Sequence, residues 1–139
     1  MARTRILLAE DNEALLAELC RELKDEFEIV GTASNGQDAV DGVLRLDPDI
    51  VVLDITMPIL NGIQTSLRIH ESHPRSKILF LTIHENEEYV SAAFSAGATG
   101  YVTKRRLASD LLRAIQEVGR GNVFLSPTLR RAHDNPESS

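Results

Sequence analysis

The chain has 139 residues, enough for one domain with a single sizeable core. No apolar run reaches the ~20 residues of a membrane span, and the first ten residues lack the apolar stretch of a signal peptide, so a cytoplasmic protein is expected. The net charge of −6 argues against nucleic-acid binding by this segment, because surfaces that bind phosphates are usually basic. The single cysteine, Cys20, excludes an internal disulfide and lies in an apolar helical pattern that favours packing.

Short apolar runs alternate with longer amphipathic stretches from residue 5 onward. Residues 5–10 (RILLAE) predict a strand, and residues 12–25 predict a helix, because apolar side chains recur there at helical spacing. A second strand is predicted at 27–33. A second helix is predicted at about 36–46, where it must stop before Pro48.

The third unit begins with the strand DIVVLD at 49–54 and continues through a loop rich in turn residues into a helix that ends near residue 71. The fourth unit combines a strand at 77–82 with a helix at 85–97. Each unit therefore repeats the order strand, then helix.

The fifth unit is a strand at 98–103 followed by a helix at 106–121. Five alternating units predict an α/β fold with a five-stranded parallel sheet, helices on both faces and right-handed crossovers. The chain then turns polar and contains Ser and Pro, which is typical of a linker or a frayed end. We therefore assign 1–121 to one domain and 122–139 to a linker or tail.

Carboxylates stand where two of the predicted strands end. Glu10 and Asp11 follow the first strand, and Asp54 ends the third. Asp54 could simply start a turn, and Glu10 or Asp11 could cap a helix, but neither reading accounts for all three. Because the carboxyl ends of these strands are neighbours in such a sheet, the three carboxylates should converge and repel one another. A hard divalent cation such as Mg²⁺ would relieve that repulsion.

Two further polar side chains end strands at the same edge of the sheet. Thr82 ends the fourth strand and Lys104 follows the fifth. A hydroxyl and an ammonium are suited to hold the oxygens of a phosphoryl group added to Asp54. Taken singly, Thr82 could be an ordinary strand-end hydroxyl, Lys104 a solvated charge, and Tyr101 an aromatic that covers the sheet edge.

The motifs LLAEDN, DITMPILNG, LFLT and GYVTK, in this order and spacing, resemble the receiver (phosphoacceptor) domain of a two-component response regulator. The resemblance covers residues 5 to about 120. It implies a doubly wound, flavodoxin-like or CheY-like sheet with the strand order 2-1-3-4-5.

The resemblance also implies roles for individual residues. Glu10, Asp11, Asp54 and the backbone carbonyl of Thr56 would bind Mg²⁺. Asp54 would accept the phosphoryl group from a sensor histidine kinase, Lys104 would pair with that group, and Thr82 and Tyr101 would form a switch pair. Such a chain is not an enzyme beyond its own phosphotransfer and autodephosphorylation at Asp54.

The segments ASNGQDAV, LTIHENEEYV, AGATGYVTK and GNVFLSP resemble regulators of the NarL/FixJ type, which carry a C-terminal helix-turn-helix domain. That resemblance implies a homodimer promoted by phosphorylation and control of transcription through an attached DNA-binding domain. The alternative is a stand-alone receiver that acts through protein–protein contacts or as a phosphate sink. The reading frame beyond Ser139 distinguishes the two.

Overall fold

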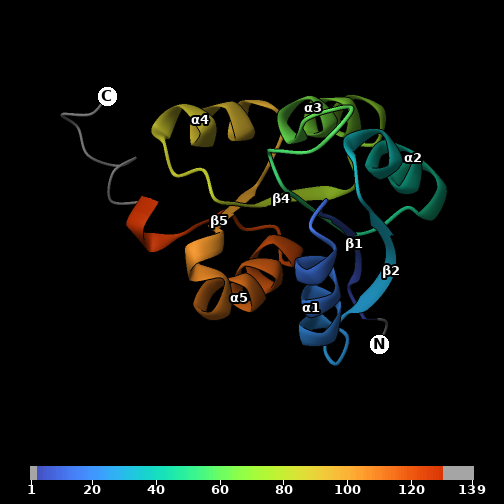
Figure 1. Ribbon diagram of the computed structural model, residues 1–139, viewed down its shortest axis with the longest axis horizontal. Helices are drawn as coiled ribbons and strands as arrows, with labels where there is room; N and C mark the ends of the chain where they lie inside the picture. Colours follow the sequence, from blue (N-terminus) through green and yellow to red (C-terminus); the bar gives the residue numbers. More distant parts are fainter. Residues whose placement is uncertain (1–2, 130–139) are drawn as a thin grey trace.

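A six-stranded parallel sheet lies between two layers of helices (Figure 1). The coordinates are a computed structural model that describes residues 3–129. In spatial order the strands are β2 (Glu28–Ala33), β1 (Arg5–Ala9), β3 (Ile50–Leu53), β4 (Lys77–Thr82), β5 (Gly100–Thr103) and β6 (Phe124–Leu125). Every neighbouring pair is parallel.

Five α-helices cover the sheet, α1 and α5 on one face and α2, α3 and α4 on the other (Figure 1). Their bounds are α1 (Glu13–Leu23), α2 (Gly36–Leu46), α3 (Gly62–Ser72), α4 (Glu87–Ser95) and α5 (Leu107–Gly119), and a 3₁₀ turn, η1 (Lys104–Arg106), precedes α5. Side chains of a strand alternate between the faces, so Leu7 and Ala9 pack with the second group of helices and Ile6 and Leu8 with the first. In the residues described, no helix is long and apolar enough to cross a membrane.

Asparagine side chains start three of the helices. Asn12, Asn35 and Asn61 each accept a hydrogen bond from the backbone N–H three residues ahead, which satisfies a donor that the first turn leaves free. Asn61 also forms a capping box with Gln64. These caps place the helix starts directly after the strand-end loops, where the candidate site residues lie.

The predicted fold class is confirmed, and the strand order 2-1-3-4-5 is extended by a sixth strand that the sequence did not predict. Phe124 and Leu125, expected in a linker, are 5% and 6% exposed, and Phe124 pairs with Gly100 of β5. The apolar run Val123–Leu125 has only three residues, too few for a strand signal. Phe124 and Leu125 form a strand because β5 presents an open edge of backbone donors and acceptors. Residues 130–139 of the expected linker lie outside the described part.

Candidate functional site

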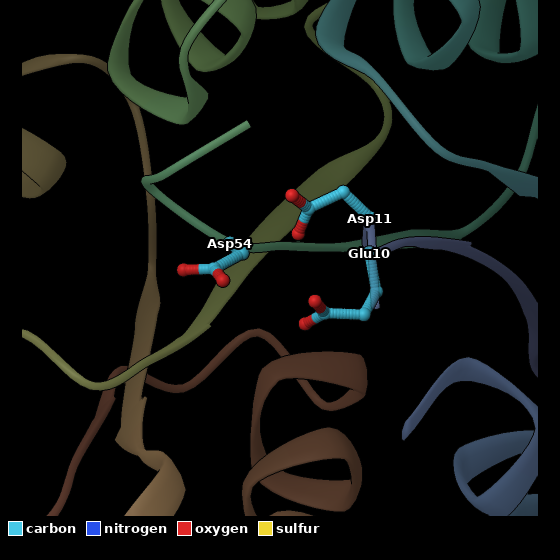
Figure 2. Close-up of side chains that lie close together, drawn as sticks. All are labelled: Glu10, Asp11 and Asp54. Atoms are coloured by element: carbon cyan, nitrogen blue, oxygen red, sulfur yellow. The ribbon is translucent and has the colours of Figure 1, made fainter. Parts of the chain in front are cut away.

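Three carboxylates gather where β1 and β3 end (Figure 2). One oxygen each from Glu10, Asp11 and Asp54 lies within 4.8 Å of the others. Glu10 and Asp54 are buried, at 3% and 5% exposure, whereas Asp11 is exposed. The expected convergence is therefore present, with two carboxylates inside the protein and one at its surface.

Lys104 supplies the positive charge inside this cluster. Its Nζ lies 2.9 Å from Asp54 Oδ2 and 2.9 Å from Glu10 Oε1. Burial alone would lower the pKa of Lys104, but hydrogen bonds and charges from Glu10 and Asp54 outweigh it and raise the pKa above its ordinary value. Burial raises the pKa of Glu10, against the opposing effect of Lys104. The pairing with Glu10 was not foreseen, because the resemblance assigned Lys104 to the phosphoryl group alone.

The donor set fits a hard divalent cation. Asp54 Oδ1 is buried and has no hydrogen-bond partner among residues 3–129. This carboxylate oxygen is therefore free to bind a cation together with oxygens of Glu10 and Asp11. One ammonium does not balance three carboxylates, and oxygen-only ligands are those that Mg²⁺ prefers.

Gly62, the first residue of α3, holds the loop after β3 close to Asp54. Its N–H donates to the carbonyl of Ile55 at 2.7 Å. A Cβ at position 62 would stand 2.1 Å from the backbone oxygen of Asp54, so only glycine allows this approach. The short path from Asp54 to α3 leaves Thr56 exposed at the mouth of the site, where its carbonyl ligand role stays a prediction.

Both residues of the expected switch pair are fully buried. Thr82 ends β4, and Tyr101 lies in β5 with its ring 6.1 Å from that of Phe80 and its hydroxyl donating to the carbonyl of His84 at 2.7 Å. Burial, and secondarily the charges of Asp54 and Glu85, raise the pKa of Tyr101. Tyr101 therefore does not merely cover a sheet edge, since β6 lies beyond it and its ring is inside the core.

His84 was missed by the sequence analysis, which assigned no role to a histidine. It lies in a loop, and its Nε2 is 2.8 Å from Thr56 Oγ1 and its ring stacks on Tyr89 with centroids 4.2 Å apart. His84 thus joins the loop after β3 to α4. Its position two residues beyond Thr82, at the same sheet edge, was the available signal.

Comparison with known proteins agrees with this geometry. Residues 6–116 match the response regulator receiver domain family. The chain is 34% identical over 128 residues to the transcriptional regulatory protein LnrK of Bacillus subtilis and 32% identical over 126 residues to the nitrate/nitrite response regulator protein NarL of Escherichia coli. These matches cover 90% and 89% of this chain but 58% of each relative, so the chain spans just over half their length.

Solved structures that superpose on this chain include response regulators. A two-component response regulator of the LuxR family from Aurantimonas sp. SI85-9A1 superposes with a TM-score of 0.93 at 28% identity, covering 99% of this chain and 100% of that one. A DNA-binding response regulator of the LuxR family from Staphylococcus aureus gives 0.79 at 29% identity, covering 84% and 98%. The chain therefore belongs to the response regulator receiver domain family, and its relatives are regulators of the NarL and LuxR type.

Proposed function

We propose that Asp54 accepts a phosphoryl group from a phosphorylated histidine of a sensor kinase. One observation carries the proposal: the buried Asp54 carboxylate has one oxygen held by Lys104 and the other without a partner in residues 3–129, beside two more carboxylates. A purely structural ion pair would not leave a buried oxygen unsatisfied.

The transfer balances as a displacement at phosphorus. A carboxylate oxygen of Asp54 forms the new O–P bond, the N–P bond of the phosphohistidine breaks, and the leaving imidazole takes up a proton. Lys104 neutralises charge on the transferred oxygens, and the Thr82 hydroxyl donates to one of them. The chain thus takes part in phosphotransfer only by accepting the phosphoryl group on Asp54. We propose no other enzymatic activity for it.

Glu10, Asp11 and Asp54, with the carbonyl of Thr56, would hold Mg²⁺. When bound, the cation supplies charge neutralisation for the phosphoryl oxygens and offsets the repulsion of the three carboxylates. The residues themselves fix where Asp54 points: Glu10 shares Lys104 with it, and Gly62 packs against its backbone.

The signal would leave this domain through an attached DNA-binding domain that controls transcription. The support is twofold: LnrK is a transcriptional regulatory protein, and the Staphylococcus aureus neighbour is a DNA-binding response regulator. Because this chain carries a net charge of −6, contact with DNA phosphates would fall to that other domain.

Labelling with acetyl phosphate and Mg²⁺ tests the proposal. Wild type should label, Asp54→Asn should fall to background, and EDTA should abolish labelling of wild type. Asp25→Asn is the matched control, since Asp25 is an exposed turn residue that follows the C-terminal end of α1, whereas the site lies before its N-terminal end. Unimpaired labelling of Asp54→Asn, or labelling that survives EDTA, contradicts the proposal.

A further inference from the structure

A buried polar cluster fastens the segment after α5 to the sheet. Asp110 of α5 is 5% exposed and Ser126, directly after β6, is fully buried. Ser126 Oγ donates to Asp110 Oδ2 at 2.9 Å and accepts from the backbone N–H of Thr103 at 3.3 Å. Arg106 binds the same carboxylate with Nε 3.0 Å from Oδ2. We call Thr103, Arg106, Asp110 and Ser126 the clasp.

The clasp contacts β5 and η1, the segments that carry Tyr101 of the expected switch pair and Lys104. Ser126 N–H donates to the carbonyl of Tyr101 at 3.0 Å, and Leu125 is the strand partner of Tyr101. Thr103 directly precedes Lys104, the first residue of η1, and Arg106 is its last. The same turn therefore directs Lys104 toward Asp54 and Arg106 toward Asp110.

Glu85 holds the same turn from the other side. Its carboxylate accepts hydrogen bonds from Thr103 Oγ1 at 3.0 Å and from Arg105 Nη2 at 2.7 Å. Glu85 lies in the loop that follows Thr82. The turn formed by residues 103–106 thus makes three contacts. Lys104 binds Asp54, and Thr103 binds both Glu85, in the loop after Thr82, and Ser126.

We propose that the clasp is a regulatory latch: it holds residues 124–129 against β5 while Lys104 is paired with Glu10 and Asp54, and it loosens when Asp54 is phosphorylated. The inference rests on the proposed function. Its physical basis is that a phosphoryl group on Asp54 gives the Lys104 ammonium new oxygens to bind, which changes the position of the turn that Lys104 begins.

A long hydrogen bond of the clasp lies next to that turn. The Thr103 N–Ser126 Oγ distance of 3.3 Å lies at the long end of the hydrogen-bond range, so a small displacement of Thr103 breaks it. Asp110 remains paired with Arg106 in that case, but β6 has only two residues and loses one of its few anchors. Four residues of this segment are buried, Phe124, Leu125, Ser126 and Leu129, so it can carry a change at Asp54 toward the C-terminal end of the described residues.

Hydrogen exchange of the Phe124 and Ser126 amides, with and without beryllofluoride and Mg²⁺, tests the latch. These amides donate to the carbonyls of Thr99 and Tyr101, so their exchange reports on β6 alone. In wild type we expect exchange at least about fivefold faster in the beryllofluoride state, the lower end of ordinary coupling between sites. Equal exchange in both states, in a protein that labels normally at Asp54, overturns the latch and leaves the proposed function intact. Failure to label at Asp54 contradicts both.

Ser126→Ala should release the segment without phosphorylation. The amides of Phe124 and of residue 126 should exchange fast in both states of this variant. Because coupling is reciprocal, it should also bind beryllofluoride about fivefold more tightly than wild type. Ser76→Ala is the control. Ser76 is similarly buried, and its hydroxyl donates to the carbonyl of Pro48. Both residues lie just before the N-terminal ends of strands, at the edge of the sheet opposite the site. The Ser76→Ala variant should match wild type in both measurements.

Asp110→Asn is the second variant and should behave like Ser126→Ala, because it removes the charge that holds Arg106 while keeping the side-chain volume. If beryllofluoride affinity is unchanged in the folded variants, or shifts equally in Ser76→Ala, the clasp is a structural anchor and not a latch.

Discussion

Asp47 ends α2 in the left-handed backbone conformation, with φ 51° and ψ 58°. Hydrogen bonds from Arg75, and then from His73, lower the pKa of its carboxyl to about 2. The folded pKa is thus below the unfolded value of ~3.9, so the stabilisation is complete above pH ~4 and is lost as the pH falls toward 2. Asparagine also tolerates this backbone conformation, so Asp47→Asn isolates the charge.

We therefore expect Asp47→Asn to lower the melting temperature at pH 6 and to leave it near wild type at pH 2, as measured by thermal unfolding across that range. Asp25→Asn, at an exposed site, should show no such convergence. A difference from wild type that stays constant with pH would show that the charge of Asp47 does not stabilise the fold.

Ile83 follows Thr82 at the mouth of the site, where a bulky β-branched side chain with a stiff χ1 could hinder attack by water on phosphorylated Asp54. Ile83 is 67% exposed, so it does not pack down onto α4. We expect Ile83→Ala to shorten the half-life of the phosphorylated protein about tenfold, equivalent to ~1.4 kcal/mol in the barrier. Val123→Ala, at a comparably exposed position after α5, should leave the decay unchanged. Equal half-lives for Ile83→Ala and wild type would show that Ile83 does not guard the site.

At the scale of elements, the expected switch pair links two neighbouring strands, since Thr82 ends β4 and Tyr101 lies in β5. Tyr101 of β5 reaches the loop through its hydroxyl bond to the His84 carbonyl, while Thr82 Oγ1 accepts a long 3.4 Å hydrogen bond from the His84 N–H. Movement of Thr82 toward a phosphoryl group would weaken that bond and change the surroundings of Tyr101, biasing a population already present.

NMR of the Tyr101 ring with and without beryllofluoride measures this directly. We expect its resonances to shift, whereas those of Phe27, buried beside α1 and remote from the switch, should stay in place. An unchanged Tyr101 ring environment would rule out its role in switching.

At the scale of the whole molecule, α5 offers one apolar side chain to a partner. Of its apolar residues at 107, 111, 112, 115 and 118, only Leu112 is exposed, at 39%, so not all five belong to the core. We expect this exposed leucine to contribute to the homodimer that the resemblance implies.

Sedimentation velocity with and without beryllofluoride tests dimerisation. We expect self-association to strengthen in the beryllofluoride state and Leu112→Ser to weaken it about tenfold, or ~1.4 kcal/mol. Leu67→Ser, at a comparably exposed leucine of α3, should leave it unchanged. A monomer at every concentration in both states would exclude the dimer.

The sequence by itself determined the layout of this protein. Apolar runs of strand length and helix-period stretches are local signals, so the positions of the first five strands and the five helices could be predicted to within a few residues. Since the carboxyl ends of parallel strands meet at one edge, the gathering of Glu10, Asp11, Asp54 and Lys104 followed from their places after the strands.

Only the tertiary structure decided which side chains touch. The pairing of Lys104 with Glu10, the bond between Thr56 and His84, and the link from Ser126 to Asp110 join residues 16 to 94 positions apart. None leaves a periodic trace in the sequence, because such contacts arise only when the packing of helices and strands brings polar groups from distant parts of the chain together. The strand β6 arose in the same way: an open edge of β5 ordered a short segment that composition alone marks as linker.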